Sequence, residues 1–176
     1  VESSTMRMGI EPMIHFGTVR GSRLKEPSFS VEASTSTFHG AESDVWFYAN
    51  LGGEWVGSLR MVLALAGELD KRCRAEIRGF AKEHRANTRS MYRVSTVEVD
   101  SRYRNRGIGT GLYSEAIRFA ARRRRLLVSD NFGIGGETST EAKWVWEKLL
   151  THLPGMTCEP EDSLNPGYAI YGVLED

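Results

Sequence analysis

The order of hydrophobic and polar residues predicts a β-hairpin at the start of the readable part of the chain. Apolar runs at 45–49 and 55–65 are separated by Gly52-Gly53, and Asp44 stands directly before the first run. Paired glycines supply the positive φ angles that a two-residue hairpin turn needs. We therefore expect two antiparallel strands joined by a tight turn.

A strand, a glycine-containing turn and a helix are predicted next. Residues 92–99 are rich in β-branched residues, which favours a strand. After the turn, apolar residues recur at helical spacing and predict an amphipathic helix over 110–123. These apolar residues are Leu112, Ala116, Ile117 and Ala120.

The last third of the chain predicts a strand, a helix and a closing strand. Residues 126–130 form a short apolar run that is typical of a buried strand. A helix is expected to begin near Thr138, because Glu141 follows it at the spacing of a capping box. Residues 168–174 predict the closing strand.

Four segments carry weaker patterns. Residues 1–43 form an N-terminal segment that we expect to belong to the same domain as 44–176. Within it, 28–38 is rich in Ser and Thr and suggests loop or edge structure. Residues 69–86 are charged with sparse apolar positions, which predicts an exposed helix or a long excursion. Gly133–Gly136 predicts a flexible loop.

Composition limits the class of protein. The chain has 176 residues, 40% of them hydrophobic, as expected of one soluble globular domain. Its 23 Lys and Arg balance 23 Asp and Glu, which argues against nucleic acid as a partner. No apolar run reaches the length of a membrane span, and no signal segment is recognisable. The scattered Cys73 and Cys158 favour a reducing cytoplasm, and the four His follow no metal-ligand spacing.

The stretch Arg104–Gly109 carries the strongest chemical signal. Helix N-termini after a glycine turn bind phosphate, because their N–H groups lack intrahelical acceptors and glycine lets an anion approach the backbone. A dinucleotide fingerprint would need a third glycine where Leu112 stands, and a P-loop would need Gly-Lys-Ser/Thr, which is absent. A plain turn is the remaining alternative. The flanking strand, arginines and helix favour a phosphate site.

This arrangement resembles the acetyl-CoA site of the Gcn5-related N-acetyltransferase (GNAT) superfamily. Its signature is Gln or Arg, two free positions, Gly, one free position, then Gly or Ala, and Arg104, Gly107 and Gly109 match it. The resemblance covers about 44–173 in order of elements and is specific in motif from about 94 to 149. It implies a single α/β (α+β) domain, with a mostly antiparallel twisted sheet, a splayed central parallel pair and flanking helices.

The resemblance also implies which residues hold acetyl-CoA. In the family, an apolar–x–apolar triplet at the strand end pairs its backbone with the pantetheine arm, and the turn binds the pyrophosphate. The triplet here is Val97-Glu98-Val99, and Arg106 would add positive charge. The implied cofactor-binding residues are Val97, Glu98, Val99, Arg104, Asn105, Arg106, Gly107, Ile108, Gly109, Thr110 and Ser139.

The family's usual general acid is missing. In relatives, an Asn, an Ala three residues on and a Tyr four beyond that line the cofactor, and the Tyr often protonates the departing thiolate. This chain has Ser139, Ala142 and Trp146 at those spacings. An indole N–H is too weak an acid for this role, so Trp146 is expected to pack in the core. Another group or water would then protonate the thiolate, or the reaction would proceed without a dedicated acid.

The general base is open between several carboxylates. Many relatives carry Glu or His where Arg93 stands. Regular alternation places Glu98 on the strand face opposite Arg93, so Glu98 and Asp100 would serve only if the strand bulges or a water relays the proton. Asp130, at the end of the splayed strand, would sit at the mouth of the V that the two strands of the central parallel pair form. We take Glu98 and Asp130 as the catalytic candidates, with surface or capping carboxylates as the alternative.

Two other groups of residues have competing interpretations. Arg122–Arg125 ends the helix, where cations complement its dipole. We expect it to be solvated, with a CoA 3′-phosphate or an acidic partner as alternatives. Trp46, Trp55 and Trp144 are expected in the core, with an aromatic acceptor pocket as the alternative.

The function expected from the resemblance is direct transfer of acetyl from acetyl-CoA to a primary amine. The acceptor would be a protein lysine or N-terminus, or a small amine. The alternative is a catalytically weak or inactive module that binds CoA or a partner with the same fold. A relative that modifies a nucleic-acid base is disfavoured by the zero net charge. No membrane partner is expected, and a homodimer stays open.

Overall fold

The structure is a computed structural model that describes residues 9–10, 29–38, 41–132, 138–161, 163 and 165–172. The loop predicted at Gly133–Gly136 lies outside these residues. The strands are β1 (Gly9–Ile10), β2 (Ser30–Phe38), β3 (Ala41–Leu51), β4 (Glu54–Leu65), β5 (Ser90–Val99), β6 (Leu127–Val128), β7 (Gly155–Cys158) and β8 (Gly167–Ile170). The helices are α1 (Arg74–Glu83), α2 (Ile108–Arg122) and α3 (Thr140–Leu150), with 3-10 turns η1 (Ala66–Glu68), η2 (Ser101–Tyr103) and η3 (Asp130–Phe132).

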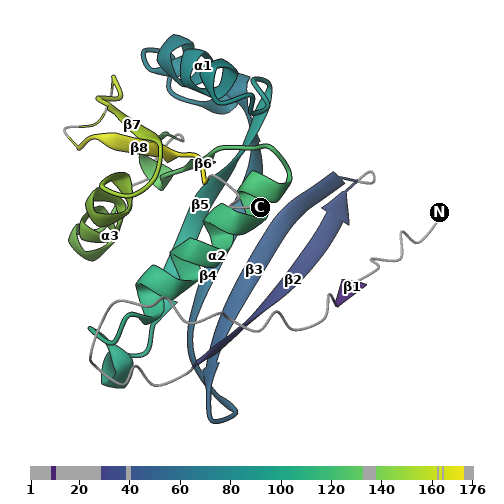
Figure 1. The fold of residues 1–176 in the computed structure, drawn as a ribbon, viewed down its shortest axis with the longest axis vertical. Coiled ribbons are helices and arrows are strands. Elements are labelled where there is room, and N and C mark those ends of the chain that lie inside the picture. The colour runs from purple at the N-terminus through teal and green to yellow at the C-terminus, as the bar shows by residue number, and fades with distance from the viewer. Residues whose placement is uncertain are drawn as a thin grey trace.

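The described strands form one eight-stranded sheet in the order β1-β2-β3-β4-β5-β6-β8-β7 (Figure 1). Every neighbouring pair is antiparallel except β5 and β6, which run parallel in the middle of the sheet. The predicted fold, a mostly antiparallel sheet with a central parallel pair and flanking helices, is confirmed.

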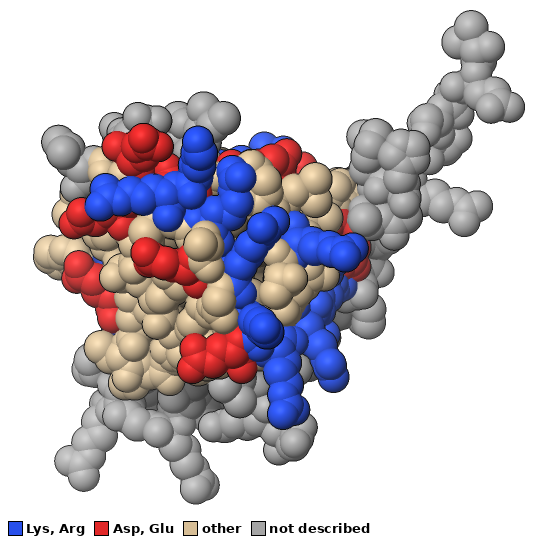
Figure 2. All heavy atoms as spheres, turned by 90° about the horizontal axis from the view of Figure 1, so that it is seen from above, with Lys and Arg blue, Asp and Glu red and all other residues tan. Residues whose placement is uncertain are grey.

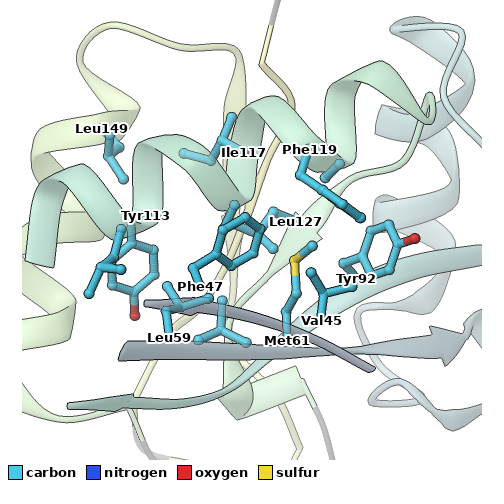
Figure 3. Close-up of a cluster of buried hydrophobic side chains, with 14 of the residues drawn as sticks. Val45, Phe47, Leu59, Met61, Tyr92, Tyr113, Ile117, Phe119, Leu127 and Leu149 are labelled. Atoms are coloured by element: carbon cyan, nitrogen blue, oxygen red, sulfur yellow. The ribbon is translucent and has the colours of Figure 1, made fainter. Parts of the chain in front are cut away.

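Two hydrophobic clusters lie on opposite faces of the sheet, as the alternation along the strands requires. Tyr92 and Leu127 belong to the first cluster, and their neighbours Met91 and Val128 belong to the second. In the first cluster, α2 covers the sheet (Figure 3). Its labelled members are Val45, Phe47, Leu59, Met61, Tyr92, Tyr113, Ile117, Phe119, Leu127 and Leu149. The long α2 is therefore fixed on the sheet by burial of its apolar face.

Helix α1 covers the other face near the β4–β5 connection. It lies in the segment predicted as an exposed helix or long excursion, and the helix is confirmed. Its apolar positions are not exposed, however, because Cys73, Ile77 and Ala81 are fully buried in the second cluster. None of the described helices is long and apolar enough to cross a membrane.

Cys73 and Cys158 form a disulfide, which corrects the expectation of scattered thiols. The bond joins the start of α1 to β7, and the two Cα atoms are 5.9 Å apart. The 85-residue separation hides this contact from the sequence, since β7 itself was not predicted.

Several element boundaries differ from the predictions for local reasons. Residues 30–38, where loop or edge structure was expected, form a full strand, because β2 pairs with β3 along its whole length and buries Val31. The cap of α3 is Ser139 rather than Thr138, since the Ser139 hydroxyl accepts a hydrogen bond from the Ala142 N–H at 3.2 Å. The described closing strand, β8, ends at Ile170.

The packing of α2 on β4 depends on a glycine. A Cβ at Gly57 would lie 2.9 Å from the Glu98 carbonyl oxygen and 3.3 Å from Ile108 Cγ2. We predict that Gly57→Ala lowers the free energy of unfolding by about 1–3 kcal/mol, measured by denaturant titration, because β5 and α2 must both move away from the new methyl group on β4. The matched control is Gly79→Ala in α1, where a Cβ meets nothing within 4 Å. This change should instead raise the free energy of unfolding by up to about 1 kcal/mol, because alanine has a higher helix propensity than glycine. Unchanged stability in Gly57→Ala would contradict the close approach.

Candidate active site

Strands β5 and β6 separate after only two paired positions. Tyr92 pairs with Leu127 and Arg93 with Val128, and the Tyr92 N–H donates to the Leu126 carbonyl at 2.9 Å. The next residue after β6, Ser129, donates its N–H to the Tyr168 carbonyl of β8 and so leaves β5. From Val94 onward, β5 therefore has no β6 neighbour, and the two strands form a V with its apex at Arg93.

A β-bulge in β5 changes which side chains share a face. Arg60 of β4 pairs with Thr96, and Met61 pairs with Val94, which leaves Ser95 as the extra residue. Both Val94 and Val97 consequently pack against the cluster under α2, although they are three positions apart and regular alternation would place them on opposite faces. Glu98 then lies on the same face as Arg93. The condition set for Glu98 as a candidate base, a bulged strand, is met.

The free edge of β5 offers backbone groups to a ligand. The Asp100 N–H donates to the Val56 carbonyl of β4 at 2.9 Å, so Glu98, two residues earlier, also faces β4. By alternation, the N–H and C=O groups of Val97 and Val99 point away from β4, into the V. The predicted triplet thus lies where an extended ligand could pair with it as an added strand.

The glycine turn ends in the first turn of α2. Gly107 is the N-cap of α2 with φ 81°, and Asn105 has φ 60°, so both adopt the left-handed conformation. The first helical hydrogen bond runs from Gly111 N–H to the Gly107 carbonyl at 2.9 Å. The N–H groups of Ile108, Gly109 and Thr110 therefore have no intrahelical acceptor. A Cβ at Gly107 would meet nothing within 4 Å among the described residues, so no described side chain crowds the backbone at this end of the turn. Free N–H groups of this kind can bind an anion.

Arginines surround this turn, and they play different parts. Arg102 is ion-paired with Asp100 at 2.8 Å and with Glu54 at 2.7 Å. The Arg102 and Arg106 guanidinium groups each lie 5.4 Å from the centre of the Tyr103 ring. Arg104 is exposed and has no ion pair among the described residues. It is thus free to bind a phosphate oxygen.

An ion pair closes the apex of the V, so Asp130 lies at the apex and not at the mouth, where it was expected. Arg93 Nη1 and Asp130 Oδ1 are 2.5 Å apart, and both side chains are about three-quarters buried, with exposures of 27% and 26%. Burial raises the pKa of the Asp130 carboxyl, and the nearby Arg93 charge and hydrogen bond act against this rise. The two candidate bases are thus separated: Asp130 is at the apex and Glu98 is near the glycine turn.

Asp100 and Ser139 serve as caps. The Asp100 carboxylate accepts from the Arg102 N–H at 2.9 Å and from the Arg102 guanidinium, which holds the pKa of Asp100 below its ordinary value. Asp100 is therefore a weak candidate for a base. Ser139 caps α3, although its own O–H can still donate to a ligand. Beside it, the buried Thr138 hydroxyl has no hydrogen-bond partner among the described residues.

Trp146 packs in the core, as expected. It is fully buried, stacks on Tyr168 with ring centres 6.0 Å apart, and meets Tyr113 edge-on at 5.4 Å. Tyr113 is a functional candidate that sequence reasoning missed. It is a buried phenol on α2 whose pKa is raised, first by burial and further by the charge of Asp130. No motif in the sequence marked it.

The arginine run lies at the far end of α2 from the glycine turn. Fifteen helical residues separate the two by about 22 Å, which argues against a role in binding the CoA phosphates. Arg123 is ion-paired with Glu42 and lies over Phe119, and Arg125 lies over Tyr92. Arg122 and Arg124 are exposed. Figure 2 shows Lys and Arg side chains gathered on one side of this end of the molecule.

The three tryptophans expected in the core are all partly exposed. Trp144 on α3 is 71% exposed and Trp55 in β4 is 39% exposed. Trp46 of β3 is half-buried and stacks on Tyr48 with ring centres 5.9 Å apart. The expectation of core burial is wrong, because these strand and helix positions face away from both hydrophobic clusters.

Comparison with known proteins identifies a family. A model described as "Acetyltransferase (GNAT) family" matches residues 18–133. A search of curated proteins finds no significant match. Among solved structures, Arabidopsis thaliana NAA60 in complex with acetyl-CoA is similar, with 15% identity over 74% of this chain and 76% of that chain and a TM-score of 0.47.

Two further structures show a comparable likeness. An agmatine N-acetyltransferase variant in its apo form has 13% identity over 71% of this chain and 74% of that chain, with a TM-score of 0.46. The Bacillus subtilis N-acetyltransferase YlbP in complex with coenzyme A has 13% identity over 72% of this chain and 66% of that chain, with a TM-score of 0.44. These likenesses are too distant to indicate what this chain acts on.

The apex carboxylate should give stability a distinctive pH dependence. Because the folded-state pKa of Asp130 is raised, its contribution is full below the unfolded pKa and is lost as pH rises through the folded pKa. We predict that the stability of the wild type relative to Asp130→Asn is greater near about pH 3 than at about pH 7, measured by urea unfolding at each pH.

Asp100→Asn is the matched contrast, because the pKa of Asp100 is lowered. The wild type should gain stability relative to this variant as pH rises through the pKa that Asp100 has in the folded protein, since the paired carboxylate forms there. The same sign of pH dependence in both variants would contradict the assignment of Asp130.

Proposed function

Because this chain belongs to the acetyltransferase (GNAT) family, we propose that it transfers acetyl directly from acetyl-CoA to a primary amine. The observation that carries the proposal is the alignment of the free β5 edge with the N-terminus of α2. Val97 and Val99 lead along the V to Gly107, where no described atom lies within 4 Å of a Cβ position and the following N–H groups lack intrahelical acceptors. One site thus presents strand backbone for an amide-rich arm and a helix N-terminus for phosphates.

Each end of the acetyl-CoA molecule has a matching group of residues. The pyrophosphate would bind the backbone from Asn105 to Thr110, and Arg104 supplies a cation without a partner among the described residues. The pantetheine arm would run along Val97 and Val99. Because β5 leads from the glycine turn to the apex, the thioester would lie towards the bulge and the Arg93–Asp130 pair.

The reaction needs few groups from the protein. The acceptor ammonium loses a proton, its nitrogen forms a bond to the thioester carbonyl carbon, and the C–S bond breaks to release the CoA thiolate, which takes up a proton. A strand N–H near the thioester would polarise the carbonyl oxygen, and the V would hold both substrates in line.

Asp130 is our choice of general base, and Glu98 is the second candidate. Asp130 lies at the apex, where the thioester would be, and burial raises its pKa towards the range useful for proton transfer. Glu98 is exposed and closer to the glycine turn, so it would act through a water. Ser139 would donate a hydrogen bond to the pantetheine arm. The indole N–H of Trp146 is too weak an acid for this step, so the thiolate would be protonated by water or by the Tyr113 phenol.

A second function, CoA binding without effective catalysis, is favoured by one observation. The position expected to carry the general acid holds a fully buried Trp146, so the family's usual proton donor has no counterpart there. Both functions require the same cofactor site and differ only in turnover.

The cofactor site can be tested by thermal unfolding with and without acetyl-CoA. Ligand at about a hundred times its Kd should stabilise the wild type by about 2.7 kcal/mol. We predict that Arg104→Ala weakens this stabilisation and that Gly107→Glu abolishes it, because a carboxylate there repels the pyrophosphate. Release of free CoA thiol in the presence of an added amine then distinguishes an active enzyme from a module that only binds CoA.

Two controls match these variants. Arg122→Ala removes an exposed arginine at the other end of α2 and should keep the full stabilisation. Gly107→Ala imposes the same left-handed strain as Gly107→Glu without adding charge. Gly107→Ala should therefore lose less of the stabilisation by acetyl-CoA. A folded wild type that acetyl-CoA does not stabilise would refute the proposed function.

A further inference from the structure

We propose that the Cys73–Cys158 disulfide is a redox-controlled latch on the apex of the V, and that its reduction by a dithiol weakens the binding of acetyl-CoA. The bond joins the residue directly before α1 to the last residue of β7. Its effect on acetyl-CoA rests on the proposed function. Its effect on the apex is argued from the structure alone.

The bond links the two parts of the sheet that the V divides. Cys73 lies in the connection between β4 and β5, so it belongs to the part that ends with β5. Cys158 belongs to the other part, because β7 pairs with β8 and β8 pairs with β6. The main chain crosses between the two parts through α2, and the disulfide is a second covalent crossing. The loop that it closes contains β5, the glycine turn, α2, β6 and the start of α3, which is the whole candidate site.

Hydrogen bonds of Asp70 complete the latch. Asp70, three residues before Cys73, donates its N–H to the Phe132 carbonyl at 2.9 Å. Its carboxylate accepts from the Cys73 N–H at 3.2 Å and from the Glu161 N–H at 3.1 Å. Glu161 is three residues after Cys158. One short segment of the β4–β5 connection is thus bound both to the residues that follow β6 and to the residues that follow β7.

The contact with Phe132 brings the latch to the apex. Phe132 ends η3, the turn that begins with Asp130, and Asp130 is ion-paired with Arg93 of β5. Beside this pair, β5 and β6 are joined at two positions of the described sheet. The apex is therefore a junction with few bonds, and the place of Asp130 depends on what holds η3. The disulfide fixes the segment that supplies this support.

A reductant can reach one of the two sulfur atoms. Cys158 is half-buried on a strand at the edge of the sheet, whereas Cys73 is fully buried. A thiolate of the dithiol attacks the Cys158 sulfur, the S–S bond breaks, and Cys73 leaves as a thiolate that takes up a proton. The second thiol of the reductant then displaces Cys158. Two electrons and two protons pass to the protein, and the dithiol becomes a disulfide.

The fold has other supports that remain after reduction. Ile77 and Ala81 of α1 are fully buried in the second cluster, and β7 pairs with β8 along its whole length. Reduction therefore frees the Asp70 segment without unfolding the chain. Its bond to Phe132 then opens more often, and η3 and Asp130 lose their fixed position. Acetyl-CoA binds less tightly because the thioester end of its site must be ordered on binding.

Amide hydrogen exchange without ligand tests the latch itself. In the wild type reduced with dithiothreitol, the Asp70 N–H should exchange at least about tenfold faster than in the oxidised protein. The Tyr92 N–H, which donates to the Leu126 carbonyl across the apex, should also exchange faster. The Glu98 N–H faces β4 and should change little. Equal exchange at Asp70 in both states would overturn the proposal. Loss of the folded state on reduction, seen by circular dichroism, would also overturn it, because the bond would then brace the whole fold.

Calorimetry of acetyl-CoA binding to the folded protein tests the control of the site. Reduction should raise the Kd at least about fivefold, and reoxidation should restore it. The matched control is Cys158→Ser, which should bind like the reduced wild type and should not respond to dithiothreitol. A bond that only stabilises the fold would leave the Kd unchanged, and that result would contradict the proposal. If reduction speeds exchange at Asp70 but neither state binds acetyl-CoA, the latch on the apex stands and the proposed function fails.

Discussion

The separation of β5 from β6 is the constraint on which the rest of the site depends. Two parallel pairs hold the strands together, and Ser129 then hydrogen-bonds to β8 instead of β5. A strand in the middle of a sheet normally satisfies its backbone on both edges, because unpaired N–H and C=O groups are costly to bury. Here β5 is paired with β4 on one edge, and the N–H and C=O groups of Val97 and Val99 face the other edge, where no described strand pairs with them. The fold therefore creates backbone groups that need a partner, and an extended ligand can supply it.

The other features of the site follow from keeping this V open at one end and closed at the other. The Arg93–Asp130 pair joins the strands at the apex, at the last level where they are close. At the open end, Gly57 lets α2 approach β4, and this fixes the first turn of α2 beside Val99. The bulge at Ser95 then turns Val97 towards α2 and Glu98 towards the opposite face. A single extra residue thus places Val94 and Val97 on one face of the sheet and Arg93 and Glu98 on the other.

The fold was largely predictable from the sequence because its main elements carry local signals. The paired glycines at 52 and 53 marked the hairpin, and the 3.6-residue period marked α2. Strand β2 was not predicted, because its Ser and Thr residues are stabilised by pairing with β3 rather than by burial. The inward face of α1 and the Cys73–Cys158 bond depend on contacts between distant segments, which no local pattern encodes.

For the candidate site, the sequence indicated the turn but not the geometry of the strand beside it. Arg104, Gly107 and Gly109 form a recognisable motif because their spacing is fixed by the turn itself. The bulge has no such motif, so regular alternation placed Glu98 on the wrong face.

Amide hydrogen exchange at the free edge of β5 tests the central claim most directly. The Val97 and Val99 N–H groups point into the V, whereas the Glu98 N–H faces β4 and serves as an internal reference. With saturating acetyl-CoA, exchange at Val97 and Val99 should slow by at least about tenfold, while exchange at Glu98 changes little. If exchange at Val97 and Val99 is unchanged in a protein saturated with acetyl-CoA, the ligand does not pair with β5, and the account of the site is wrong.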